Sequence, residues 1–268
     1  MPIKTYWWRG GGGQGNYGDK LGPAIIQALS GQQVQFCSIE DADILAIGSV
    51  LETWFWPHDS WSHYSGFIWG VGRMLGKHPI QFRNARFAAV RGHLTEHSLS
   101  SSIITPVAVG DPGLLCPALH HPVRAPRFKL GVWPHWSELH NPHFRRLIES
   151  SPDICLIDPC GDIRSTLDQV VSCEAIASSS LHGLITADAF QIPNCWIRLN
   201  SGNEDTAGMP LFKYLDYYSG YSTSAPVPSS LTAETKLDSI LMKASLSHHS
   251  SVSGLQETLL RVFPFRRT

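Results

Sequence analysis

The sequence predicts an α/β protein of two Rossmann-like domains that face each other across a cleft. Short apolar stretches, each ending at a glycine or a small polar residue, alternate with stretches of helical spacing. The alternation breaks at residues 120–127, where prolines indicate a linker, and then starts again. A length of 268 residues allows one large unit or two domains of about 130 residues. The interruption favours two domains, residues 1–124 and 125–268.

Four stretches of the first half have the pattern of buried strands. Their sequences are IKTYWW, DILAIGS, GFIWGVG and RFAAVRG, at residues 3–8, 43–49, 66–72 and 86–92. Between the first two, residues 21–31 (LGPAIIQALSG) predict a helix with Pro23 in its first turn and Gly31 at its end. This alternation is typical of a parallel sheet with glycine-containing turns at the carboxyl ends of its strands.

The second half repeats the alternation. Strands are expected at FKLGVWPH, DICLIDP, EAIASSS and PNCWIRL, which are residues 128–135, 153–159, 174–180 and 193–199. Helices are expected at HFRRLIESS, DIRSTLDQVVS and LHGLITADAF, which are residues 143–151, 162–172 and 181–190.

Composition and charge exclude several classes of function. The chain has 21 basic and 22 acidic residues, so no electrostatic argument favours nucleic acid as a partner. Its start lacks the pattern of a secretory signal, and no apolar run reaches the roughly 18 residues of a membrane span. The six cysteines are scattered, with no spacing that indicates a metal site. We expect a cytoplasmic protein without a metal.

The segment SSSLHG, residues 178–183, is the first candidate site. Its serines fall between a predicted strand and a predicted helix, where serine caps the helix and the first backbone N–H groups lack partners. Such a helix end attracts anions. His182 is expected in the first helical turn, and Gly183 to let a ligand approach the backbone. A plain serine-capped helix with an incidental histidine is the alternative.

Two aromatic and glycine-rich segments of the first half are further candidates. GGGGQGNYGDKLGP, residues 10–23, brings Asn16 and Asp19 to the start of a helix, although an ordinary turn would have the same pattern. The segment ETWFWPHDSW, residues 52–61, offers indole rings such as Trp54 and Trp56 on which sugars could stack. Most tryptophans serve packing instead.

Three single residues have side chains suited to anions or to polar ligands. Arg91 follows a predicted strand, Asp111 lies in VGDPGLL, and Lys213 lies in FKYLDYYSG. Arginine can bind a phosphate or carboxylate through two parallel hydrogen bonds, whereas lysine acts as a point charge. Each residue alone would be expected on the solvated surface, so only their combination indicates a site.

In this order, NYGDKLGP, DILAIGSVL, WGVGR, AAVRG, VGDPGLL, WPHW, SSSLHGLITADAFQIP and FKYLDYYSG resemble the polysaccharide pyruvyl transferase family. The resemblance is greatest to the shorter bacterial members, of the xanthan type, that form pyruvate ketals on exopolysaccharide units. It covers about residues 14–220, and VGDPGLL and SSSLHGLI are its most specific parts.

The resemblance implies a fold similar to the two-domain GT-B glycosyltransferases, phosphoenolpyruvate as donor, and no metal or other cofactor. It implies that His182 is the acid and base. Donor-binding residues would be Arg91, Ser179, Ser180, Leu181, Gly183 and Lys213, and the acceptor side would hold Asn16, Asp19, Trp54, Trp56, Asp111 and His135.

The implied reaction moves the enolpyruvyl group of phosphoenolpyruvate onto two hydroxyls of one sugar and releases phosphate. The implied acceptor is a lipid-linked oligosaccharide, which would bring the protein to the cytoplasmic face of the inner membrane as a peripheral protein. Residues 252–268 are expected to form a helix packed back on the N-terminal domain, with membrane docking as the alternative. Two rival functions stay open: a nucleotide-sugar glycosyltransferase of the same fold and a non-catalytic sugar-binding protein.

Overall fold

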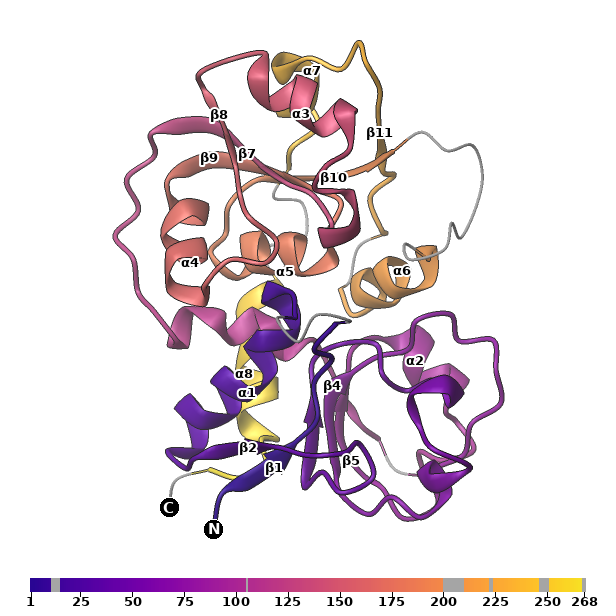
Figure 1. Cartoon of the computed structure of the whole chain (residues 1–268). Coiled ribbons are helices and arrows are strands. Elements are labelled where there is room, and N and C mark those ends of the chain that lie inside the picture. The colour runs from indigo at the N-terminus through magenta and orange to yellow at the C-terminus, as the bar shows by residue number, and fades with distance from the viewer. Residues whose placement is uncertain (11–14, 105, 200–209, 222–223, 246–250, 267–268) are drawn as a thin grey trace.

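The computed structural model describes residues 1–10, 15–104, 106–199, 210–221, 224–245 and 251–266. It contains two parallel sheets with helices packed on them, one sheet in each half of the molecule (Figure 1). This confirms the predicted α/β class. Residues 11–14 of the glycine-rich segment lie outside the described residues.

The first sheet has the order β2-β1-β3-β4-β5-β6, and all of its neighbouring strands are parallel. Its strands are β1 (Ile3–Thr5), β2 (Val34–Phe36), β3 (Ile44–Ala46), β4 (Phe67–Val71), β5 (Arg86–Val90) and β6 (Ala108–Val109).

The second sheet has the order β11-β10-β9-β7-β8, again parallel throughout. Its strands are β7 (Phe128–Trp133), β8 (Ile154–Leu156), β9 (Cys173–Ser178), β10 (Asn194–Leu199) and β11 (Ser229–Leu231). The sequence placed the last strand at residues 193–199. In the structure a further strand, β11, pairs with β10 from Ile197 to Leu199.

Both sheets share one topology. Counted along the chain within each sheet, the first five strands lie in the order 2-1-3-4-5. The strand order therefore reverses between β1 and β3 in the first sheet and between β7 and β9 in the second. Ligands of such sheets bind beyond the carboxyl ends of the strands at this reversal.

The helices follow the predicted alternation. They are α1 (Tyr17–Ser30), α2 (His93–Ser98), α3 (Pro142–Glu149), α4 (Ile163–Val171), α5 (Leu181–Ala189), α6 (Leu211–Ser219), α7 (Leu237–Leu241) and α8 (Val252–Arg261). Four short 3₁₀ helices are η1 (Thr53–Phe55), η2 (Ser60–Ser62), η3 (Pro112–Ala118) and η4 (Trp136–Glu138). In the described ranges, none of the helices is both long and apolar enough to cross a membrane.

Helix α1 begins four residues earlier than the sequence pattern indicated. Asn16 caps it by accepting a hydrogen bond from the backbone N–H of Asp19 (3.1 Å), so Pro23 lies inside the helix and not in its first turn. Gly31 ends the helix in the left-handed conformation (φ 68°), as expected.

The end of the chain returns to the first sheet. Helix α8 packs beside β6 and η3, and the carbonyl of its Leu259 accepts a hydrogen bond from the indole N–H of Trp69 (3.1 Å). Phe263 packs on the same indole, with ring centroids 4.7 Å apart.

A shared hydrophobic core joins the two halves, and each half also has a core of its own. Tyr17 of α1 packs edge-on against Trp133 of the second sheet, with ring centroids 5.0 Å apart, and its hydroxyl accepts a hydrogen bond from Thr186 of α5. Helix α6 lies between the halves, against α2 of the first (Figure 1).

Candidate active site

A cavity of about 360 Å³ lies where the two halves meet. This volume is within the range of roughly 300–1,000 Å³ that is usual for ligand sites. Its walls come from segments that follow β1, β3, β4, β7 and β9, and from α6, so it lies at the reversal of strand order in both sheets. The first half contributes Trp8, Asn16, Asp19, Gly48, Ser49, Val50, Phe55 and Met74, and the second contributes His135, Trp136, Ser137, Ser180, Leu181, His182 and Lys213.

His182 stands in the first turn of α5 and contacts the first turn of α1. A Cβ atom on Gly18 would lie 1.9 Å from its Nδ1, so the imidazole fits only against glycine. Its Nε2 is buried and has no hydrogen-bond partner among the described residues. Burial, and then the positive charges of Lys213 and Arg91, lower the pKa of His182 to about 3. The ring is therefore neutral at pH 7.

The amino end of α5 is open toward the cavity. Ser180 is the N-cap residue, but its side chain makes no capping hydrogen bond. The N–H groups of Leu181 and His182 belong to the first turn, which has no intrahelical acceptors. An anion placed here would gain both N–H groups and the positive end of the helix dipole.

Gly183 has a packing role that the sequence did not indicate. A Cβ atom here would lie 2.3 Å from Oγ of Ser178 and 3.0 Å from the indole of Trp133. The residue is buried and does not line the cavity. The expectation that it opens the backbone to a ligand is thus replaced by close packing of α5 on β9 and β7.

Lys213 of α6 is the cation of the cavity. Its side chain is 7% exposed, and its Nζ makes no hydrogen bond or ion pair with any described residue; it lies 5.2 Å from the ring centroid of Tyr214. Burial and the charge of Arg91 lower the pKa of Lys213 to about 8, against the opposing influence of Asp19 and Glu138. A nearly buried ammonium without a bound carboxylate is costly unless a ligand supplies the anion.

Two more titratable groups face the same cavity. Burial raises the pKa of Asp19 to about 7, although Lys213 and a hydrogen bond with Asn16 act against this. Burial, Lys213 and His182 lower the pKa of His135 to about 3. At neutral pH the cavity thus holds two neutral imidazoles, a charged lysine and a carboxyl group whose pKa lies near 7.

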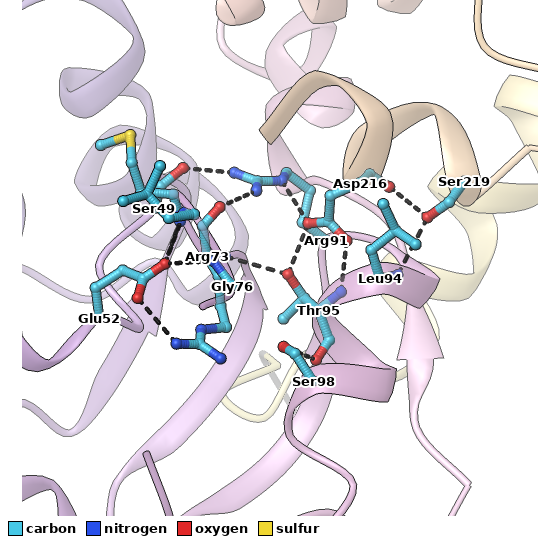
Figure 2. Close-up of polar contacts among 12 residues, drawn as sticks. Ser49, Glu52, Arg73, Gly76, Arg91, Leu94, Thr95, Ser98, Asp216 and Ser219 are labelled. Atoms are coloured by element: carbon cyan, nitrogen blue, oxygen red, sulfur yellow. Dashed lines mark hydrogen bonds and ion pairs between the residues drawn. The ribbon is translucent and has the colours of Figure 1, made fainter. Parts of the chain in front are cut away.

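Arg91 lies behind the cavity and does not line it. Its side chain is 1% exposed, and its guanidinium donates to Asp216 (2.9 Å), to Oγ of Ser49 (2.7 Å) and to the carbonyl of Arg73 (Figure 2). The carboxylate of Asp216 also accepts from the backbone N–H and the hydroxyl of Thr95, both at 2.7 Å. Arg91 therefore fixes α6 against the first half and acts on the cavity through its charge.

A second buried ion pair holds the loop that carries Met74. Glu52 pairs with Arg73 (2.9 Å), and its other carboxylate oxygen accepts from the backbone N–H groups of Met74, Leu75 and Gly76. Figure 2 shows both ion pairs side by side.

Four more of the residues proposed from the sequence lie outside the cavity lining. Ser179 is fully buried and connects the backbone N–H of His135 to the carboxylate of Glu138. Asp111 is buried and caps η3 through the N–H of Gly113 (2.8 Å), and burial raises its pKa to about 6.

The two tryptophans that the sequence suggested for sugar binding, Trp54 and Trp56, also lie outside the cavity lining. Trp56 is 4% exposed, packs on Tyr64 and Phe82, and donates its indole N–H to the carbonyl of Val50. Trp54 is 50% exposed but lies against His78, outside the cavity lining. Trp56 is thus held in the core, and Trp54 lies on the surface away from this cavity.

Sequence reasoning missed several lining residues, of which Trp8, Ser49, Trp136 and Ser137 carry the most chemistry. Each follows the carboxyl end of a strand, which is the signal that could have identified them. Over the described ranges, no group of three or more histidine, cysteine or acidic residues is placed to hold a metal ion.

Comparison with known proteins leaves the family open. No family model matches the chain. Uncharacterized protein L143 of Acanthamoeba polyphaga mimivirus is 26% identical over 220 residues, which covers 76% of each of the two chains. This similarity does not indicate an activity, because the relative is itself uncharacterized.

Proposed function

We propose that this protein is a pyruvyl transferase, which adds phosphoenolpyruvate to two hydroxyls of a hexose in an exopolysaccharide repeat unit and releases phosphate as a cyclic ketal forms. One observation carries the proposal: Lys213 is nearly buried, without an ion pair among the described residues, in a cavity that His182 and the open amino end of α5 also line. In this proposal the two doubly wound sheets form a GT-B-like pair, with the reaction between them.

The donor is an anion with two charged ends, a phosphate and a carboxylate. The N–H groups of Leu181 and His182 suit one end, and the ammonium of Lys213 suits the other. Arg91 adds positive charge from behind Ser49, although its own hydrogen bonds go to protein groups.

The reaction begins with a proton on the methylene carbon of the donor. Burial, Lys213 and Arg91 keep His182 neutral, and a bound phosphate and carboxylate offset the two positive charges. The pKa of His182 then rises, the imidazole takes up a proton, and this proton passes to the methylene carbon, which becomes a methyl group.

Two additions complete the ketal. The first sugar hydroxyl attacks the adjacent carbon and gives its proton to the neutral His182. The bond to the phosphate oxygen then breaks, and phosphate leaves with the proton that His182 has just taken from the hydroxyl. The second hydroxyl attacks the same carbon and loses its proton to Asp19, which can accept it because its pKa is about 7. Two hydroxyl protons thus balance one new C–H bond and one protonated phosphate.

Product analysis in heavy water tests the proposal. The protein is incubated with phosphoenolpyruvate and methyl hexopyranosides in D₂O, and the product is examined by ¹³C and ¹H NMR. We expect a ketal whose methyl group carries one deuterium. Transfer of a sugar from a nucleotide sugar, with no ketal from phosphoenolpyruvate, would identify a glycosyltransferase instead.

A further inference from the structure

Two tryptophans, one from each half, meet at the cavity. The rings of Trp8 and Trp136 are tilted by 37°, with centroids 5.4 Å apart, and both line the cavity that holds His182 and Lys213. We infer that this pair, here named the indole pair, is the platform on which a pyranose ring of the acceptor binds. That the bound sugar is the acceptor of the reaction rests on the proposed function.

The residues around Trp8 pack on a different ring. Tyr6 and Trp7 contact Phe36, with centroids 5.9 and 4.9 Å apart, and the guanidinium of Arg9 lies 3.5 Å from the centroid of the same ring. Trp8 instead contacts Trp136 and lines the cavity. The packing of its neighbours on Phe36 therefore holds the segment from which Trp8 reaches the cavity.

Trp136 is tied to the segment that carries His182. It opens the short helix η4, whose N-cap residue His135 donates its backbone N–H to Oγ of Ser179 (2.9 Å). The same hydroxyl donates to Glu138 at the other end of η4 (2.5 Å). Buried Ser179 therefore sets the position of Trp136 relative to α5. We assign Ser179 this positioning role, whereas the sequence predicted a contact between Ser179 and the donor phosphoenolpyruvate.

The surroundings of the indole pair suit a sugar. With their centroids 5.4 Å apart, the two indoles leave no room for a third ring between them, so a ligand can use only their outer faces. Trp136 is 42% exposed, and a large apolar ring gains free energy when a ligand covers it. The side chains of Asn16, Asp19 and Ser137 line the same cavity and can bind hydroxyl groups. An apolar face beside such groups matches a pyranose, which has C–H bonds on its faces and hydroxyls at its edge.

Saturation-transfer NMR tests the inference without any turnover. Methyl β-D-glucopyranoside, methyl β-D-galactopyranoside and methyl α-D-mannopyranoside are the probes, because they carry no aromatic group of their own. We expect saturation of ring C–H protons in the wild type, loss of this signal in Trp8→Ala and Trp136→Ala, and partial recovery in Trp136→Phe. Trp54→Ala is the matched control, since Trp54 is exposed to a similar degree (50% against 42% for Trp136) but lies outside the cavity lining.

Kinetics of phosphate release give the second readout. Trp136→Ala should raise the acceptor KM about ten-fold and leave the affinity for phosphoenolpyruvate unchanged. Hexoside signals that persist in both alanine variants, that fall equally in Trp54→Ala, or that are missing in the wild type would each overturn the inference. Hexoside binding at the indole pair without any phosphate release would refute the proposed transferase function but not the sugar platform. Phosphate release with an unchanged acceptor KM in both Trp8→Ala and Trp136→Ala would refute the sugar platform but not the transferase function.

Discussion

Replacing Lys213 with methionine removes the positive charge of the cavity and keeps a long, flexible side chain in its place. The pKa of Lys213 falls from 10.5 to about 8 in the folded protein, chiefly through burial. At about 1.4 kcal/mol for each tenfold change in proton affinity, the charged form costs the folded state about 3 kcal/mol. The unfolded chain holds this proton more tightly, so the cost is present in full below pH 8 and disappears as the pH rises from 8 to 10.5.

Lys213→Met should therefore have opposite effects on stability and on binding. At pH 7 its free energy of unfolding should exceed that of the wild type by up to about 3 kcal/mol, and this gap should shrink to about 1 kcal/mol at pH 10. Affinity for phosphoenolpyruvate should fall roughly 10- to 150-fold, because a hydrogen bond to a charged group contributes about 1.5–3 kcal/mol.

Urea denaturation at pH 7 and pH 10 measures the first effect, and isothermal titration calorimetry with phosphoenolpyruvate measures the second. Lys129→Met is the matched control, because Lys129 is an exposed residue whose ion pair with Asp153 (2.8 Å) lies on the surface. It should leave stability nearly unchanged and binding unaffected, because exposed ion pairs contribute little. A Lys213→Met protein that is less stable than the wild type and still binds phosphoenolpyruvate normally would refute the reasoning.

Three further predictions follow from the contacts around the cavity. Binding of phosphoenolpyruvate at pH 7 should take up a proton at His182, whose pKa starts at about 3, so affinity should rise as the pH falls. Calorimetry in two buffers of different ionisation enthalpy should show less proton uptake in His182→Gln than in the wild type. Equal proton uptake in the two proteins would count against the mechanism. Gly18→Ala should displace the imidazole of His182 and abolish phosphate release, at a stability cost of about 1–3 kcal/mol. Gly254→Ala is the control and should be harmless, because nothing lies within 4 Å of its new Cβ. An active Gly18→Ala enzyme would contradict the close contact between Gly18 and His182. Arg91→Met should lower the free energy of unfolding, measured in urea, by about 3–5 kcal/mol, because it leaves Asp216 buried without its cation. Adding Asp216→Leu to this variant should restore part of the lost stability. If the losses of the two single variants simply add in the double variant, the pair is not coupled.

The sequence predicted the fold well because its signals are local. Apolar runs that end at small residues identified the strands around residues 44–46, 67–71 and 173–178, and the serine-rich segment before Leu181 identified the start of α5. Asn16, Asp19, His135 and His182 were expected in a site because they follow strands or begin helices, and the structure brings all four to one cavity.

Contacts between distant parts of the chain could not be predicted in this way. Arg91 has the pattern of a ligand-binding residue at a strand end, but its partner Asp216 lies 125 residues further on. The burial of Trp56 and the exposure of Trp136 depend on how η1 and η4 pack, which composition does not reveal. Gly183 was assigned to ligand approach because the close contact with Ser178 of β9 has no signature in the sequence.

The most direct test of the proposed function is acceptor-dependent release of phosphate from phosphoenolpyruvate. The acceptors are methyl hexopyranosides with free hydroxyls at O4 and O6, and the wild type is compared with His182→Gln, which keeps the size and polarity of the side chain but cannot carry the proton. We expect release that requires both substrates and is lost in the variant. Release at the wild-type rate in His182→Gln, or no release from phosphoenolpyruvate with any hexoside, would contradict it.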